Sequence, residues 1–253
     1  MKSFIASLFL LVAVAAGAQN TRVVAHRGYW DTPDNAQNSL TALKAAQSIP
    51  VYGSEFDVNM TADGVMVVSH GPKLESIPDV QKATYKEVKK VRLQNGEKVP
   101  TLKQYLKQGK KGNIKLIFEL KVHPAGEREN EAVRKSVEMV KKMKLEDEVE
   151  FISFSLEACR QLAQMMPECM VQYLNGKIPP KEIKDMGIMG IDYHYSNFEQ
   201  HPEWVKEAQE LGMIVNVWTV NKEELMQKMI DLGVDFITTD KPEKVLELID
   251  NKK

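Results

Sequence analysis

Cysteine is scarce in this sequence, with only Cys159 and Cys169 among its 253 residues. This count excludes the small disulfide-dense scaffolds, and a chain of this length can bury a stable core without cross-links. The two residues could form one disulfide in an exported protein, or they could remain separate buried thiols. The sequence leaves both interpretations open, and we prefer the second.

The sequence also lacks an excess of charge of either sign. Its 34 lysines and arginines oppose 35 aspartates and glutamates, which gives a formal net charge of -1. This balance argues against the broad positive surface that nucleic-acid binding requires. It leaves room for a small, locally positive pocket that binds an anionic small molecule.

Long apolar runs are missing except near the first residue. Lys2 precedes an apolar run over residues 5–16, which is shorter than a membrane-spanning helix needs. Ala16-Gly17-Ala18 matches the small-x-small pattern at which secretory signals are cleaved. We therefore expect a signal peptide over residues 1–18 and a mature domain over 19–253, periplasmic or secreted and without stable membrane insertion. The alternative is an uncleaved anchor.

No Gly-x-Gly-x-x-Gly follows the first strand-like run, which weakens a dinucleotide-binding interpretation. Strand-like runs do alternate with helical ones along the chain. A companion strand at 65–69 follows the Asp63-Gly64 turn signal, and the stretch from 71 to about 100 is less regular. Eight strand–helix units in about 250 residues predict a single-domain TIM (β/α)8 barrel; an open doubly wound sheet is the alternative. The eight main strands are expected at residues 22–25, 53–58, 114–120, 149–154, 169–173, 190–193, 213–220 and 234–238.

Unusual polar residues occur where these strands end, and the carboxyl ends of barrel strands converge on one mouth. Glu55 and Asp57 stand at i and i+2, so both side chains point to one face of the second strand. Glu119 and Lys121 repeat this spacing at the end of the third strand. The remaining residues of this kind are His26 and Arg27 after the first strand, His70 after the companion strand, and Trp218 near the end of the seventh.

Three carboxylates in one small volume repel one another, and a hard divalent cation removes that repulsion. Mg²⁺ and Ca²⁺ prefer oxygen ligands, so Glu55, Asp57 and Glu119 together predict a site for one such cation. For any single carboxylate, pairing with a lysine or arginine is the alternative. The sequence does not choose between the two metals.

His26 and His70 could act as base and acid on opposite sides of a substrate, although a single strand-end histidine is often only hydrogen-bonded. Arg27 offers a planar fork that suits a pair of phosphate oxygens, and Lys121 adds a point charge. Trp218 could pack against the substrate or simply fill the top of the barrel. Together these residues indicate an anionic substrate, most simply a small phosphodiester.

The chain resembles the glycerophosphodiester phosphodiesterase family. The block that opens with His26-Arg27-Gly28 and continues with Glu-x-Asp, Asp-Gly and a histidine is the specific part. The resemblance spans nearly the whole mature chain. The matching pieces are residues 26–28, 38–39, 55–58, 61–64, 67–70, 118–121 and 217–221.

The resemblance implies a barrel that hydrolyses glycerophosphodiesters to an alcohol and glycerol 3-phosphate with the help of a divalent metal. By this resemblance residues 71 to about 110 form a small insertion after the second strand, beside the barrel mouth. Glu55, Asp57 and Glu119 hold the metal. His26 and His70 form the acid–base pair, while Arg27 and Lys121 bind phosphate.

Two positions depart from the family pattern. Ala36-Gln37-Asn38 stands where the family usually has Pro-Glu-Asn, and His70-Gly71 stands where it usually has His-Asp. Gln37 can offer a carbonyl oxygen to the substrate or the cation, but it brings no charge. Because both changes remove negative charge near the expected site, we expect an altered metal affinity or metal choice.

Three other functions are compatible with parts of the sequence. A glycosidase could use Glu55 and Glu119 as its carboxylate pair, but then both histidines, Arg27 and Lys121 have no role. An exported phosphodiester-binding protein with weak or no turnover is a second alternative. A phosphodiesterase directed at lysophospholipids is a third, and no surface helix typical of membrane binding supports it.

Overall fold

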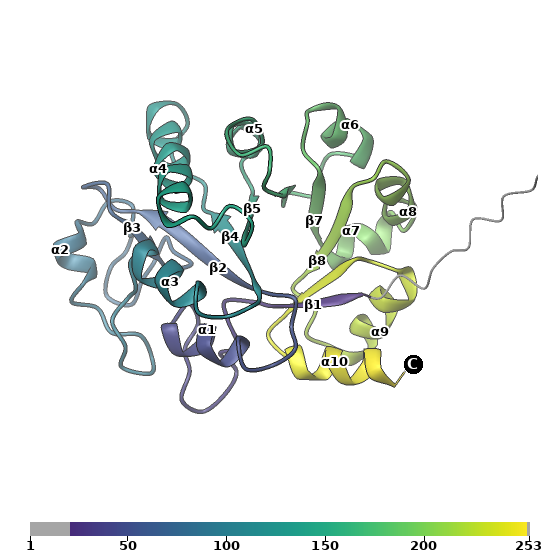
Figure 1. The fold of residues 1–253 in the computed structure, drawn as a ribbon, viewed down its shortest axis with the longest axis horizontal. Coiled ribbons are helices and arrows are strands. Elements are labelled where there is room, and N and C mark those ends of the chain that lie inside the picture. Colours follow the sequence, from purple (N-terminus) through teal and green to yellow (C-terminus); the bar gives the residue numbers. More distant parts are fainter. Residues whose placement is uncertain (1–20, 252–253) are drawn as a thin grey trace, which may run out of the picture.

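The computed structural model describes residues 21–251, so the expected signal peptide over residues 1–18 lies outside the described residues. Strands and helices alternate along this part of the chain, and the helices lie around the sheet (Figure 1). The strands are β1 (Arg22–Ala25), β2 (Gly53–Met60), β3 (Met66–Val68), β4 (Lys115–Leu120), β5 (Val149–Ser153), β6 (Val171–Tyr173), β7 (Gly190–His194), β8 (Ile214–Trp218) and β9 (Phe236–Thr239).

The sheet closes on itself. β1 pairs in parallel with both β2 and β9, and the remaining parallel pairs run in order from β2 through β4 to β9. Eight parallel strands thus form the ring, and β3 pairs antiparallel with β2 outside it. The predicted TIM barrel is confirmed, and the open-sheet alternative is wrong.

The helices surround this ring, and several of them begin with a side-chain cap. The Ser39 side chain accepts a hydrogen bond from the Ala42 backbone amide at the start of the first helix, and the Ser155 side chain accepts one from the Ala158 amide. The sequence did not predict α7, a six-residue helix that His194 caps directly after β7. The helices are α1 (Leu40–Ala46), α2 (Tyr85–Val88), α3 (Leu102–Gly109), α4 (Glu127–Met143), α5 (Leu156–Met165), α6 (Pro180–Asp185), α7 (Tyr195–Gln200), α8 (Glu203–Glu210), α9 (Glu223–Leu232) and α10 (Pro242–Asp250).

The two faces of the barrel strands carry different side chains. Phe56 of β2 points outward, where it stacks on Tyr105 of α3 and meets Phe118 of β4. The interior holds a smaller apolar cluster that includes Val24 and Ile117. Because side chains alternate along a strand, the next inward position on each of these strands lies closer to the mouth. The alternation therefore brings polar side chains to the mouth.

Residues 69–101 leave the barrel after β3 and return to it at α3. They contain α2, which lies beside β3 in Figure 1, and most of a separate apolar cluster that includes Leu74, Val80 and Val88. The predicted insertion, from 71 to about 110, covers this segment and also α3. α3 itself packs on the barrel beside α1, β3 and α4.

Cys159 and Cys169 are both free and buried in the structure. The thiol of Cys159 lies 3.5 Å from the Ser153 carbonyl oxygen, and that of Cys169 lies 3.2 Å from the Glu146 carbonyl oxygen. The preferred interpretation of two separate thiols agrees with this arrangement.

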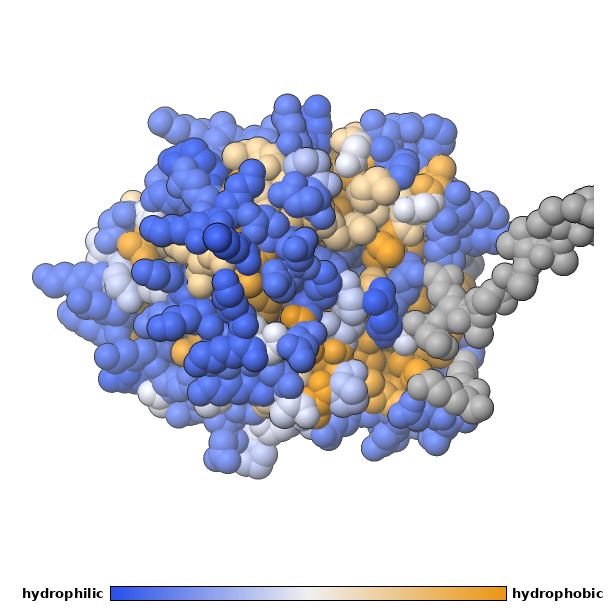
Figure 2. Space-filling view, viewed as in Figure 1, coloured by the Kyte–Doolittle hydropathy of each residue, from blue (hydrophilic) through white to orange (hydrophobic). Residues whose placement is uncertain are grey.

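Hydrophilic side chains cover most of the face shown in Figure 2, with smaller apolar areas between them. Among residues 21–251, none of the helices is long and apolar enough to cross a membrane.

Candidate functional site

The barrel mouth receives its polar residues from strand alternation. On β2, Glu55 and Asp57 alternate with the outward-facing Phe56 and Val58. On β4, Glu119 follows the inward-facing Ile117 by two residues. The β2–β4 register places Asp57 directly beside Glu119. The i, i+2 spacing in the sequence thus brings all three carboxylates to one place.

Glu55, Asp57 and Glu119 form a compact buried cluster. One carboxylate oxygen from each lies within 4.8 Å of the others. The side chains are almost inaccessible to solvent, with residue exposures of 2 %, 1 % and 8 %. Three acceptors this close together form an unfavourable arrangement unless positive charge lies between or beside them.

Arg27 and Lys121 supply part of that positive charge. Arg27 Nε lies 3.3 Å from Asp57 Oδ2, and Lys121 Nζ lies 3.1 Å from Asp57 Oδ1. The same lysine lies 2.6 Å from Glu119 Oε1. The pairing that the sequence left as an alternative to a metal is therefore present, but it centres on Asp57.

The pKa values show that these two cations do not neutralise the cluster. Burial raises the pKa of Glu119 to about 8, and the charge of Asp57 adds to this effect. Burial and the charges of Asp57 and Glu119 also raise the pKa of Glu55 well above its usual value. Although burial opposes it, the charges of Lys121 and Arg27 hold the pKa of Asp57 below its usual range. The cluster needs more positive charge than the protein provides.

The donor set fits a hard divalent cation. Oε1 of Glu55 is buried and has no hydrogen-bond partner among the described residues, whereas the buried Oε1 of Glu119 is paired with Lys121. Carboxylate oxygens are the ligands that Mg²⁺ and Ca²⁺ prefer. The cluster could hold a metal ion, and these residues do not distinguish the two metals.

A tight turn after β1 brings Arg27 to the cluster. Arg27 has a left-handed backbone (φ 56°), and its amide donates to Glu55 Oε2 at 2.8 Å. Gly28 is also left-handed (φ 83°), and a Cβ at this position would lie 2.7 Å from Cβ of Ala42 in α1. Only glycine fits between the turn and the helix, so Gly28 is required for this backbone path.

His26 lies at the mouth and has a carboxylate partner that the sequence did not reveal. Its Nδ1 lies 2.7 Å from Oδ1 of Asp240, which follows β9. Trp30 Nε1 donates to the same oxygen, and Asn221 donates to the other. The Asp240 carboxylate therefore fixes the orientation of the His26 ring and leaves its Nε2 for other contacts.

His70 follows β3, and the residue is exposed at the rim of the mouth, although the surrounding protein atoms displace part of the water around its ring. Burial lowers its pKa to about 4; the charge of Asp57 raises the value, while those of Lys121 and Arg27 lower it further. His70 is therefore neutral near pH 7 in this arrangement. A bound anion would offset the neighbouring positive charges and raise its pKa.

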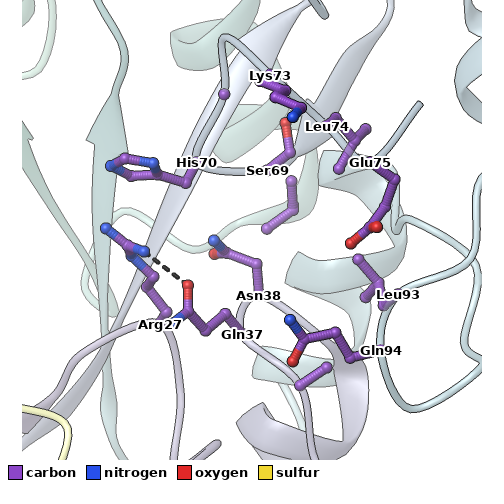
Figure 3. Close-up of a pocket in the computed structure, with 13 residues that line it drawn as sticks. Arg27, Gln37, Asn38, Ser69, His70, Lys73, Leu74, Glu75, Leu93 and Gln94 are labelled. Atoms are coloured by element: carbon purple, nitrogen blue, oxygen red, sulfur yellow. Dashed lines mark hydrogen bonds between the residues drawn. The ribbon is translucent and has the colours of Figure 1, made fainter. Parts of the chain in front are cut away.

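Gln37 and Asn38 bind the side chains around the cluster. Oε1 of Gln37 accepts a hydrogen bond of 2.6 Å from Arg27 Nη1 (Figure 3). Asn38 donates to Asp57 Oδ2 at 2.9 Å and accepts the Asp57 backbone amide at 3.0 Å. Gln37 thus orients the guanidinium, and Asn38 orients the central carboxylate.

Residues 26–244 match the sequence model of the Glycerophosphoryl diester phosphodiesterase family. The chain belongs to this family. It is 51 % identical to a glycerophosphodiester phosphodiesterase of Parabacteroides distasonis, whose crystal structure has a TM-score of 0.91 over 93 % of this chain and 99 % of that one. A glycerophosphodiester phosphodiesterase of Caldanaerobacter subterraneus subsp. tengcongensis is 29 % identical over 90 % of this chain and 98 % of its own.

A third relative carries a bound product. The structure of an Oleispira antarctica phosphodiesterase in complex with sn-glycerol 3-phosphate has a TM-score of 0.79 and 26 % identity, over 90 % of this chain and 96 % of that one. The resemblance inferred from the motifs is confirmed, and the chain is an enzyme of the glycerophosphodiester phosphodiesterase family.

Two cavities open at the mouth of this family member. The inner cavity, about 180 Å³, is lined by His26, Glu55, Glu119 and Lys121 together with apolar side chains that include Trp218. The outer cavity, about 240 Å³, is lined by Gln37 and by side chains of residues 69–94 (Figure 3). Arg27 and His70 line both cavities, so the two are neighbours.

Sequence reasoning missed three residues of this site. Asp240 follows Thr238-Thr239, which repeats the strand-end pattern that identified His26. Asp192 lies two residues after Gly190 in β7 and therefore faces the interior near the mouth. Asn38 was part of a recognised motif but received no role.

Proposed function

We propose that this protein hydrolyses glycerophosphodiesters to an alcohol and sn-glycerol 3-phosphate, with one Mg²⁺ or Ca²⁺ held by Glu55, Asp57 and Glu119. The observation that carries the proposal is the convergence of these buried carboxylates with Arg27 and Lys121 in a family member. The cation would supply electrostatic stabilisation of the negative charge on the phosphoryl oxygens.

The charges at the mouth support an anionic substrate. With all three carboxylates ionised and no metal bound, they outweigh Arg27 and Lys121 by one negative charge. One divalent cation reverses this balance to a single positive charge, which matches the single negative charge of a phosphodiester. Arg27 would then contact the phosphate oxygens through its guanidinium, which Gln37 and Asp57 hold in place.

Proton transfer needs a base on the attacking side and an acid on the leaving side. His26, oriented by Asp240, would take a proton from the attacking oxygen, which belongs to water or to a neighbouring glycerol hydroxyl. A new bond forms between this oxygen and phosphorus as the bond to the leaving alcohol oxygen breaks. His70 would donate the proton that the leaving oxygen needs. Attack by a glycerol hydroxyl gives a cyclic phosphate, which water then opens.

The two cavities suggest how the substrate lies. His26 lines only the inner cavity, so we place the glycerol side of the substrate there, beside Trp218. His70 lines both cavities, and the leaving alcohol would extend past it into the outer cavity. The apolar ring of Trp218 suits the carbon edge of glycerol.

Export remains part of the proposal, on the basis of the signal-like residues 1–18. Expression of the full chain in a Gram-negative host, followed by fractionation and mass measurement of the mature amino terminus, tests it. Cleavage after Ala18 is expected. A cytoplasmic protein that retains residues 1–18 contradicts the proposal.

The direct test of function is release of glycerol 3-phosphate from glycerophosphocholine and glycerophosphoethanolamine, with and without chelator. We expect release from at least one substrate, loss of release in chelator, and recovery when Mg²⁺ or Ca²⁺ is added back. Full activity in chelator contradicts the metal assignment. Tight binding of intact substrate without product favours a phosphodiester-binding protein instead.

A further inference from the structure

The mechanism proposed above leaves one buried acid of the inner cavity without a role. Asp192 of β7 lines this cavity, and the residue is only 1 % exposed. Its Oδ1 has no hydrogen-bond partner within residues 21–251. A buried polar atom without a partner is destabilising, so the fold retains an unfavourable group at this position.

The surroundings of Asp192 do not satisfy this oxygen. The neighbouring cavity walls are the apolar side chains of Ile152, Leu174 and Trp218. Trp218 Nε1 donates to the backbone carbonyl of Asp192 at 2.9 Å, which fixes the ring beside the carboxyl without using the carboxyl. Thr238 also lines the cavity. Its hydroxyl accepts a hydrogen bond from Asn216 Nδ2 and donates one to Asn216 Oδ1.

The carboxyl of Asp192 is suited to form hydrogen bonds with an uncharged group of a ligand. Burial raises the pKa of Asp192 well above its usual value and the negative charge of Glu119 acts in the same direction, although a hydrogen bond between the carboxyl and the Asn216 side chain opposes them. A neutral carboxyl both donates and accepts hydrogen bonds, as an alcohol hydroxyl does. Within residues 21–251 Asp192 forms no ion pair with a lysine or arginine, whereas Asp57 pairs with both Arg27 and Lys121.

We propose that Asp192 hydrogen-bonds a hydroxyl of the glycerol moiety in the inner cavity and makes this hydroxyl a requirement for efficient hydrolysis. The inference rests on the proposed function, because it assumes that the phosphodiester lies between Arg27 and Lys121 at the other side of the cavity. The Trp218 ring would cover the carbon edge of the glycerol while the carboxyl reads its hydroxyl. Asp192 is then a specificity-determining residue.

The test compares three substrates on three proteins. The substrates are glycerophosphocholine and its two analogues that lack either the 1-hydroxyl or the 2-hydroxyl of glycerol, the two hydroxyls that are free when the phosphate is at position 3. The proteins are the wild type, Asp192→Ala and Asp192→Asn. For one of the two hydroxyls, kcat/KM of the wild type should favour the complete substrate by about 10- to 100-fold, because its absence leaves the buried carboxyl unpaired.

Asp192→Ala should reduce this preference to within about threefold, mainly by lowering kcat/KM for the complete substrate. Asp192→Asn keeps a donor and an acceptor at the position and should retain most of the preference. An equal loss on all three substrates, accompanied by weaker Ca²⁺ binding in calorimetry, would show that Asp192 only supports the carboxylate cluster. An unchanged preference in Asp192→Ala also overturns the proposal.

Binding measurements separate this inference from the proposed reaction. If the wild type hydrolyses none of the substrates, the proposed function fails. The inference is then tested by calorimetry with glycerol 3-phosphate and its two deoxy analogues in the presence of Ca²⁺. The wild type should bind glycerol 3-phosphate more tightly than one of the analogues, and Asp192→Ala should not; equal binding of all three by the wild type overturns the inference.

Discussion

The inner and outer cavities are neighbours, but they are built from different parts of the chain. Barrel strands position the residues of the inner cavity, and interstrand pairing such as that of Asp57 with Glu119 fixes their spacing. The outer cavity takes Lys73, Glu75 and Gln94 from the segment over residues 69–101, which has its own small core. A rigid scaffold thus holds the reacting groups, whereas a loop segment provides the wall facing the leaving group.

Glu119→Gln should have the largest effect, because it alters one of the three carboxylates that form the metal-binding cluster of the inner cavity. The change removes one charge from the metal-binding cluster and leaves Lys121 without its shortest ion pair. We expect kcat for glycerophosphocholine to fall by more than about 10³-fold, as for loss of a central electrostatic group. Calorimetry with Ca²⁺ should show a parallel loss of metal binding.

Glu150→Gln is the matched control for this variant. Glu150 is also a buried glutamate of a barrel strand, but its partner is Tyr52, and it lines neither cavity. We expect the control to bind Ca²⁺ and turn over substrate like the wild type. Full activity of Glu119→Gln would contradict the assignment of Glu119 as a metal ligand. It would also contradict the conclusion that the inner cavity holds the reacting groups.

Asp240→Asn should have the next largest effect. An amide cannot stabilise the charged His26 ring as the carboxylate does, and it can select the wrong tautomer. We expect kcat to fall about 10- to 100-fold, as for other residues that orient a functional histidine, while Ca²⁺ affinity stays unchanged. The exposed Asp185→Asn, which disrupts only the surface pair with Lys181, is the control. Equal activity of the two variants would remove Asp240 from the mechanism.

The inner cavity was predictable from the sequence to a greater extent than the outer one. Strand alternation and a mouth shared by all barrel strands place Glu55, Asp57 and Glu119 together before any coordinates are known. Asp240 and Asp192 obey the same rule, but a single aspartate near a strand end is too common to stand out. The sequence placed Asp192 within the predicted strand over residues 190–193 and Asp240 just beyond the one over 234–238, and gave neither a role.

The outer cavity depends on long-range packing that the sequence pattern does not encode. Glu75 reaches it through a left-handed backbone (φ 49°), which a glutamate rarely adopts. The pairing of Gln37 with Arg27 also depends on how two turns meet, so the sequence suggested only a carbonyl near the substrate or cation. Periodicity predicts regular elements, and neither of these features belongs to one.

Gln37→Glu alters the contact with Arg27, the side chain that lines both cavities. The added carboxylate would lie against Arg27 Nη1, and it would increase the negative charge near the metal-binding cluster. We expect Ca²⁺ affinity to rise about tenfold through this added charge. We also expect KM to rise, because Arg27 then pairs more strongly with the protein than with phosphate.

Gln94→Glu is the control for added charge. Gln94 lines the outer cavity but makes no hydrogen bond to Arg27 in the structure. Its substitution should change Ca²⁺ affinity less than Gln37→Glu does. If Gln37→Glu leaves both Ca²⁺ affinity and metal dependence unchanged, the departure from the family pattern at this position has no bearing on the metal.

Glu75→Gln should have the smallest effect, because it alters only the outer cavity. The carboxylate of Glu75 lies on the outer-cavity side of the site in Figure 3, where the leaving alcohol would extend. An exposed carboxylate attracts a cationic head group weakly, so KM for glycerophosphocholine should rise about two- to fivefold. KM for glycerophosphoglycerol, whose head group is uncharged, should stay close to the wild-type value.

Lys73→Gln is the control, because it removes a positive charge from the same cavity. It should lower the KM for glycerophosphocholine. Equal shifts of KM for both substrates would show that Glu75 shapes the cavity without recognising the charge of the head group. The outer cavity would then differ from the inner one, whose residues recognise the substrate through charge and hydrogen bonds.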